Sequence, residues 1–261
     1  MKKLFLMLAV AAFAANASAQ NTVITSNKGG DNWYIGANAG VSTLPKESFD
    51  GASNGFFKSL APTFGVRVGK NLNTVFGLAL DADMHFKSNN KWNAGSKTFI
   101  EDVNVNLLGT FNLNNLFAGY PGEPRSFEVY GLAGIGWGHV FGYKGASLFR
   151  DNKNALTSKI ALDFTFNLGA AKAWQIYIEP NIIYALNGQK NLEYNINSAS
   201  IGANLGVNYK FGNSNGTHNF KIAELRDQAE IDGLNGKINE LRANLNDKDA
   251  IISAKDGQIR D

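Results

Sequence analysis

Ionisable side chains recur through the middle of this sequence at positions that alternate with apolar residues. Ten of them occupy the polar positions of such segments: Arg67, Asp81, Asp83, His85, Asp102, Glu128, Lys159, Asp163, Glu179 and Lys210. Carboxylates that are gathered away from water need a counter-charge or must take up protons. The pattern therefore predicts a buried network of ion pairs, provided that one fold brings these residues to the same side.

Catalysis and metal binding are the other chemistries that these residue types could support. His139 and Ser147 are near each other in sequence, but no spacing in the chain demands nucleophilic catalysis. His85, Asp81 and Asp83 come from one segment, which makes a weak set of metal ligands. The chain has no Cys, so thiolate chemistry is excluded. We predict no enzyme activity, no catalytic residue, no metal site and no cofactor.

Apolar residues recur at every second position from Trp33 to Phe211. A period of two indicates β-strands with one apolar and one polar face. The alternating segments cover residues 33–41, 64–68, 76–86, 103–113, 127–141, 160–168, 174–184 and 201–211. Two folds fit this pattern: a soluble barrel or sandwich with its apolar face inward, and a membrane barrel with that face toward lipid.

The residue types on the polar face favour the membrane barrel. Gly, Asn and other small residues leave room inside an eight-stranded barrel for charged side chains, whereas inward Phe, Trp, Tyr and Ile would crowd it. Strands of about 9–11 residues span a bilayer, and soluble strands usually have about 5–6. We predict an all-β, eight-stranded antiparallel transmembrane β-barrel over residues 33–211, followed by a C-terminal coiled-coil-like α-helix.

The inward charges make the strand register specific, because a slip of one residue would place them in lipid, where each Arg or Lys costs about 2–4 kcal/mol near the midplane. Arg67, Asp81, Asp163 and Glu179 are expected at similar depth, with Arg67 as the only base among them. We expect the Arg67 guanidinium to lie within about 4 Å of at least two of those carboxylates. If the network stays closed, the lumen is plugged and the barrel has a structural role. If the network rearranges, the barrel is a narrow gate for cations.

The first 19 residues have the three parts of a secretory signal peptide. A basic start precedes an apolar core over residues 4–15, too short to span a membrane, and Ala17-Ser18-Ala19 supplies a cleavage site. Removal of Lys2 and Lys3 takes the net charge of +3 to about +1, which speaks against nucleic-acid binding. Residues 20–32 then lead into the barrel. An even number of strands predicts that both ends of the mature chain are periplasmic, in the outer membrane of a Gram-negative-type cell.

Long polar connections are expected outside the cell, and short turns in the periplasm. The long connections cover residues 42–62, 87–97, 142–157 and 187–199, and the first and third leave an adhesin or receptor role open. Residues 71–74 and 169–173 are short enough for turns, whereas 114–126 is a long loop rich in Pro and Gly. Pro180 lies within a predicted strand, and because it has no N–H we expect a local bulge there.

The sequence changes character after the last predicted strand. Residues 212–219 are expected to form a flexible polar linker, and residues 220–261 a periplasmic helix. An apolar heptad repeat begins at Ile231 and is strongest from 231 to 245. It indicates either a coiled coil, and hence a homo- or hetero-oligomer, or a lone amphipathic helix that lies along another surface. The heptad repeat still runs at residue 261, so we expect that the helix is cut short or leads into a further segment.

The order of signal peptide, eight strands, linker and heptad helix resembles the OmpA-like outer-membrane family. The stretches that carry the likeness are 31–42 (DNWYIGANAGVS), 64–84 (FGVRVGKNLNTVFGLALDADM), 178–186 (IEPNIIYAL) and 231–245 (IDGLNGKINELRANL). The resemblance implies a structural barrel that is anchored in outer-membrane lipid, carries a periplasmic stem and supports envelope integrity. In that family a C-terminal globular domain binds peptidoglycan. No such domain is recognised in these 261 residues, so peptidoglycan is expected as a partner only if a further domain exists.

Overall fold

A computed structural model describes residues 24–25, 28–43, 60–86, 99–141, 154–187, 192–222 and 228–260. The chain divides into two units, residues 1–222 and 223–261. The predicted signal peptide and most of the long connections lie outside the described residues. None of the described helices combines the length and the apolar character that a membrane-crossing helix needs.

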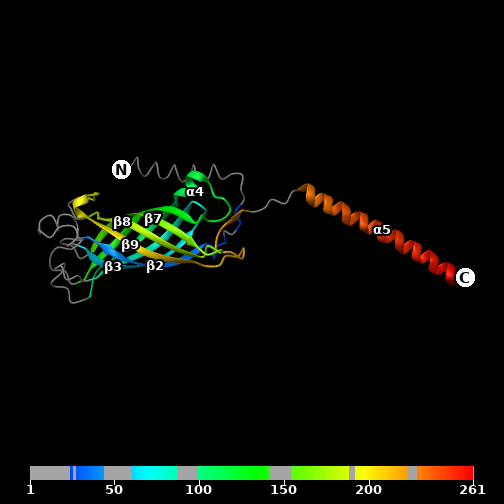
Figure 1. The fold of residues 1–261 in the computed structure, drawn as a ribbon, viewed down its shortest axis with the longest axis horizontal. Coiled ribbons are helices and arrows are strands. Elements are labelled where there is room, and N and C mark those ends of the chain that lie inside the picture. The colour runs from blue at the N-terminus through cyan, green and yellow to red at the C-terminus, as the bar shows by residue number, and fades with distance from the viewer. Residues whose placement is uncertain are drawn as a thin grey trace. The chain divides into compact units, whose positions relative to one another are not determined.

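Eight antiparallel strands of the first unit close into a barrel (Figure 1). Each strand pairs with the next along the chain, and the last pairs with the first. In chain order they are β2 (Trp33–Ser42), β3 (Ala61–Asn71), β4 (Phe76–Phe86), β5 (Ile100–Asn112), β6 (Phe127–Val140), β7 (Asn154–Leu168), β8 (Trp174–Ala185) and β9 (Ala199–Lys210). The predicted fold class is confirmed, and closure pairs both edges of the sheet.

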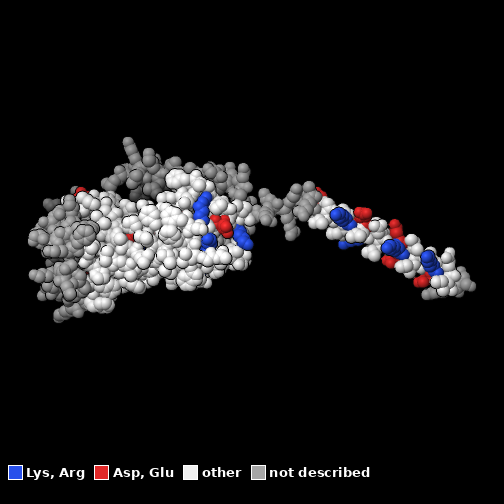
Figure 2. Space-filling view, viewed as in Figure 1, with Lys and Arg blue, Asp and Glu red and all other residues white. Residues whose placement is uncertain are grey.

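The apolar faces of the strands point out of the barrel and the polar faces point in. Leu80 and Leu205 are 55% and 59% exposed, whereas Asp81 and Glu179 are 0% exposed. A water-soluble protein would reverse these two faces. Most of the visible barrel wall carries no charged side chain, and most of the charges that do show gather near one end (Figure 2). This outer surface suits hydrocarbon rather than water.

The barrel has two different ends. We call one the turn end, because it carries the connections 72–75, 113–126 and 169–173. The opposite, loop end carries the connections 43–60, 87–99, 141–153 and 186–198. Within the last of these, η1 (Ile196–Ser198) leads directly into β9.

A short helix, α4 (Leu113–Ala118), occupies the connection that the sequence presented as a loop. The side-chain oxygen of Asn112 accepts a hydrogen bond from the Asn115 backbone N at 2.9 Å and caps the helix. Arg125 donates to the Asn115 side-chain oxygen at 2.6 Å and to the Gly119 carbonyl at 2.8 Å. The long connection therefore folds back on itself, a structure that its Pro and Gly content did not indicate.

Residues 28–32 and 212–222 form a hydrogen-bonded cap at the turn end. Asn32 and Asn213 exchange two hydrogen bonds, of 2.7 and 2.8 Å, across the two segments. The backbone N and the hydroxyl of Ser214 both donate to the Asp31 carboxylate at 2.7 Å. Residues 212–219 are thus a folded part of the barrel unit rather than the flexible linker that was predicted, because their Asn and Ser side chains bond to the chain before β2.

The C-terminal helix begins later than the sequence pattern indicated. Two short strands, β1 (Ile24–Thr25) and β10 (Lys221–Ile222), pair with each other and hold the start of the predicted helix in extended form. The Tyr120 hydroxyl donates to the Phe220 carbonyl at 2.8 Å. Burial, reinforced by Glu128 and Glu123, raises the pKa of Tyr120 and keeps this hydroxyl protonated. The helix, α5, spans Gln228–Arg260.

Two irregularities in the strands differ from the prediction. The pairs Ala161–Asn181 and Phe164–Ile178 keep one register on both sides of Pro180, so the predicted bulge is wrong. Pro180 has no backbone N–H to donate toward β7, and it still pairs with Ala203 of β9 on its other side. A register shift lies instead between His85 and Phe86.

The second unit consists of α5. Its heptad positions lie exposed along the helix: Leu234, Ile238, Leu241, Leu245, Ile252 and Ile259. Lys, Arg, Asp and Glu side chains cover much of its visible surface (Figure 2). The coiled coil stays a prediction.

Candidate functional site

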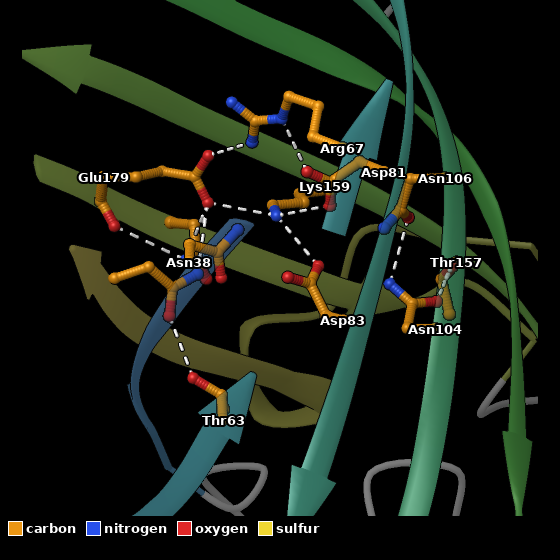
Figure 3. A network of polar contacts seen from close by, with 12 residues as sticks. Asn38, Thr63, Arg67, Asp81, Asp83, Asn104, Asn106, Thr157, Lys159 and Glu179 are labelled. Atoms are coloured by element: carbon orange, nitrogen blue, oxygen red, sulfur yellow. Dashed lines mark hydrogen bonds and ion pairs between the residues drawn. The ribbon is translucent and has the colours of Figure 1, made fainter. Parts of the chain in front are cut away.

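Arg67 of β3 points into the lumen and is bonded to three strands. It pairs in register with Asp81 of β4, and its Nε donates to the Asp81 Oδ2 at 2.7 Å (Figure 3). Its Nη1 donates to Asp163 Oδ2 of β7 at 2.8 Å, and its Nη2 pairs with Glu179 Oε2 of β8. The guanidinium thus supplies one donor to each of three carboxylates, which its planar fork allows.

Lys159 of β7 is a second cation at the same place. Its Nζ lies 2.9 Å from Asp81 Oδ1, 2.8 Å from Asp83 Oδ2 and 3.0 Å from Glu179 Oε1. Sequence reasoning placed Arg67 as the only base at this depth. The structure differs because the Lys159 ammonium, which is fully buried, reaches the same carboxylates.

We call the connected set the lumen cluster; its members are Arg67, Asp81, Asp83, Lys159, Asp163 and Glu179. Uncharged side chains add further hydrogen bonds to it. Asn181 and Asn204 donate to Glu179 Oε1 at 3.2 and 3.3 Å, and Thr63 donates to the Asn204 side-chain oxygen at 2.9 Å. Because water is excluded there, removal of one partner would leave another charge buried without compensation.

Two tyrosines fill the lumen beside the cluster. The Tyr177 ring lies 5.3 Å from the Arg67 guanidinium carbon, and its hydroxyl accepts from Asn38 at 3.3 Å. Tyr177 lies over Gly206 of β9, and Tyr34 lies over Gly69 of β3; a Cβ on either glycine would lie 2.2 Å from the ring. Sequence reasoning missed both tyrosines as site residues, although an inward ring paired with an inward glycine was a usable signal.

The remaining predicted lumen residues lie in two separate groups. At the loop end, the His85 ring N and Asp102 Oδ1 are 2.5 Å apart. The nearby register shift also buries Glu101, which the strict alternation had not selected. At the turn end, Glu128 and Lys210 both contact Asn167, at 3.0 and 3.4 Å. The predicted set is therefore distributed along the barrel rather than joined in one network.

Of His139 and Ser147, the pair weighed for catalysis, the structure describes His139 alone. The His139 ring bonds to the Asn154 side-chain oxygen at 2.8 Å and packs against Trp137 and Phe141. Ser147 lies outside the described residues. Among the residues that the structure describes, no group of three or more His, Asp or Glu is arranged to hold a metal.

Two small cavities are found among the described residues of the barrel unit. A cavity of about 40 Å³ lies beside Glu128 and Lys210, and one of about 20 Å³ lies beside Asp163. Ligand pockets usually measure about 300–1,000 Å³. The arrangement can therefore hold strands together, and neither of these two cavities has room for an organic substrate.

Comparisons with known proteins agree with this architecture. The sequence profile of the outer membrane protein beta-barrel domain matches residues 5–216. Outer membrane protein 41 of Porphyromonas gingivalis is 27% identical over 281 residues, which cover 94% of this chain and 67% of that protein.

Solved barrels are similar at lower identity. Neisserial surface protein A is 11% identical, with a TM-score of 0.45 over 70% of this chain and 100% of that one. The N-terminal β-barrel domain of Pseudomonas aeruginosa OprF is 14% identical, with a TM-score of 0.43 over 69% and 97%. Because the family match spans most of the sequence and the described strands close as the family name specifies, the chain belongs to the outer membrane protein beta-barrel family.

Proposed function

We propose that this protein is a structural barrel that anchors a periplasmic stem, α5, in the outer membrane and supports the integrity of the cell envelope. The observation that carries the proposal is the filled lumen. Arg67 and Lys159 tie β3, β4, β7 and β8 together through buried ion pairs. A barrel braced across its interior is suited to a mechanical role.

The turn-end cap supports the anchoring part of the proposal. The chain that leaves β9 is bonded to the segment before β2 through Asn213 and Ser214. Tyr120 and the β1–β10 pairing hold the next residues. A pull on the stem would therefore act first on these bonds and not directly on the last barrel strand.

Thiol labelling tests the orientation that the anchor requires. The chain has no Cys, so an introduced cysteine is the only thiol. We expect Ser253→Cys on α5 to react with a membrane-impermeant maleimide only after the outer membrane is permeabilised. Glu193→Cys, exposed at the loop end, should react in intact cells. The reverse pattern would exclude a periplasmic stem.

Complementation tests the supporting role. Cells that lack the protein should become more sensitive to detergent, and the full chain should restore resistance. A chain that ends after residue 222 keeps the barrel unit and loses the stem. We expect it to reach the outer membrane without restoring resistance. Full rescue by the barrel unit would refute the anchoring role of α5.

A narrow ion pore is a second candidate. The lumen cluster holds four carboxylates and two cations, an excess of negative charge that would favour cations if the network rearranged. An adhesin or receptor role through residues 42–62 and 142–157 falls mostly outside the described residues.

A further inference from the structure

The lumen cluster has more negative than positive groups. Asp81, Asp83, Asp163 and Glu179 face Arg67 and Lys159, and each of these six side chains is buried. Nearby inward charges are engaged elsewhere, since His85 bonds to Asp102 at the loop end and Lys210 bonds to Asn219 at the turn end. Uncompensated charge in a low-dielectric interior is costly, so a further positive charge would stabilise the cluster.

A small cavity borders the acidic side of the cluster toward the turn end. Its volume is about 20 Å³, and its polar lining comprises Tyr34, Asn71, Thr110, Tyr130, Asp163, Thr165, Gln175 and Asn208. This volume is enough for one particle of about the size of a water molecule. The cavity and the cluster share Asp163, so an occupant would lie next to the excess of carboxylates.

Two side chains that line the cavity each have an oxygen with no hydrogen-bond partner among the described residues. Asp163 uses Oδ2 for Arg67, which leaves its Oδ1. Asn208 uses Nδ2 to donate to Gln175 Oε1 at 3.3 Å, which leaves its Oδ1. Both residues are 5% exposed. Buried polar atoms nearly always have a partner, so two such acceptors at one cavity call for an occupant that offers hydrogen-bond donors or positive charge, and the excess of carboxylates beside them favours a cation over a neutral water.

We propose that this cavity binds one monovalent cation of about the size of Na⁺, held by the free side-chain oxygens of Asp163 and Asn208. Carboxylate, amide and hydroxyl oxygens are ligands for hard cations, and Thr110, Thr165 and Tyr34 add hydroxyl groups to the same lining. A divalent ion is disfavoured, because no group of three His, Cys, Asp or Glu suited to a metal occurs in the described part of the chain. The bound cation would offset part of the excess negative charge.

Urea unfolding of the full chain in detergent micelles tests the proposal. Folding is compared in NaCl and in choline chloride at equal ionic strength and fixed neutral pH. A cation that binds only the folded state raises the folded-to-unfolded ratio tenfold for each tenfold rise in its concentration above its Kd. We expect this logarithmic dependence for Na⁺ and not for choline. Equal curves in the two salts would overturn the proposal, as would a stability that responds only to acidification, since protons would then balance the cluster.

Three variants test whether the sodium dependence of stability arises at this cavity. Asn208→Ala removes one of the two oxygen ligands. Asp163→Asn removes the negative charge and, with its one remaining oxygen accepting from Arg67, presents an NH₂ group in place of the second ligand oxygen. Both variants should lose the sodium dependence. Asn181→Ala is the matched control: Asn181 donates to Glu179 in the same cluster but does not line the cavity, so its sodium response should persist. Loss of the response in Asn181→Ala, or its retention in Asn208→Ala, would overturn the assignment.

A direct measurement keeps the test independent of variant folding. The wild-type barrel in micelles should broaden the ²³Na resonance beyond micelles alone, and the broadening should saturate with added protein. Unchanged ²³Na relaxation at sodium concentrations that alter stability would overturn specific binding.

Discussion

At the scale of single residues, Arg67 of β3 connects its own strand to three others. Its three donors reach carboxylates of β4, β7 and β8, and it also lies against the Tyr177 ring. The three carboxylates come from three different strands, and Tyr177 lies on β8 together with Glu179. The side chain therefore contributes to closure of the barrel as well as to local pairing. Its contribution to stability depends on the geometry of the guanidinium as much as on its charge.

We predict that Arg67→Ala lowers the free energy of unfolding by about 3–5 kcal/mol, because Asp81, Asp163 and Glu179 would lose a buried partner. Arg67→Lys should also destabilise the barrel, since one ammonium cannot reproduce the planar fork. Urea unfolding in micelles measures both. The exposed Lys28→Ala should stay within about 0.5 kcal/mol of wild type. Unchanged stability of Arg67→Ala would contradict a bracing role.

Glycine at position 206 makes room for an aromatic ring. A Cβ there would lie 2.2 Å from Tyr177 Cζ, so we predict that Gly206→Ala costs about 1–3 kcal/mol through overpacking. The control is Gly131→Ala, where the nearest atom to the added Cβ is Leu113 Cδ2 at 3.7 Å. Thermal unfolding followed by circular dichroism compares the two, and equal melting temperatures would argue against tight packing at Tyr177.

At the scale of elements, the strands and the connections follow different rules. The strands keep their register even at Pro180, because the neighbouring pairs on both sides hold it in place. The connections at the turn end depend on individual side chains, such as Asn112 at the start of α4 and Asp31 in the cap. Single substitutions should therefore alter the connections more readily than the ladder.

The helix α5 contains three glycines that its packing does not require. A Cβ at Gly233, Gly236 or Gly257 would meet no atom within 4 Å. We predict that Gly236→Ala increases the helical signal and stabilises α5 by about 1 kcal/mol. Far-ultraviolet circular dichroism of the full chain during heating provides the measurement. A decrease in helicity would indicate that a partner packs closely against this glycine.

At the scale of the whole molecule, the closed wall and the filled lumen together limit what the barrel can do. Apolar residues such as Leu80 and Leu205 face outward, and the charges face inward. The cluster crosses the interior through ion pairs that draw on β3, β4, β7 and β8. Any conduction would require these pairs to separate.

Planar-bilayer recordings can decide between a barrel whose lumen is closed and a barrel that acts as a gate for cations. We predict that the wild-type barrel is silent, and that Arg67→Ala, by breaking three ion pairs, produces small cation-selective currents. Asp102→Asn at the loop end is the control and should stay silent, because Asp102 bonds to His85 outside the cluster. Frequent openings of the wild-type barrel would favour the pore over the structural role.

The amino-acid sequence by itself determined the faces of the strands. Side chains on successive strand residues point to opposite sides, so alternation placed Arg67, Asp81, Asp163 and Glu179 on one shared face of the strands. The small residue types on that face and the strand lengths then predicted an eight-stranded barrel with this face inward. Alternation and the heptad stripe of α5 depend only on neighbours in the chain.

Only the tertiary structure decided which inward residues meet. Lys159 joins the cluster, whereas Asp102 pairs with His85 and Glu128 lies at the turn end. The fold also converted the predicted linker into a cap. The physical reason is common to these cases: each contact joins segments far apart in sequence, and barrel register and closure, together with side-chain length, determine which of them come within bonding distance.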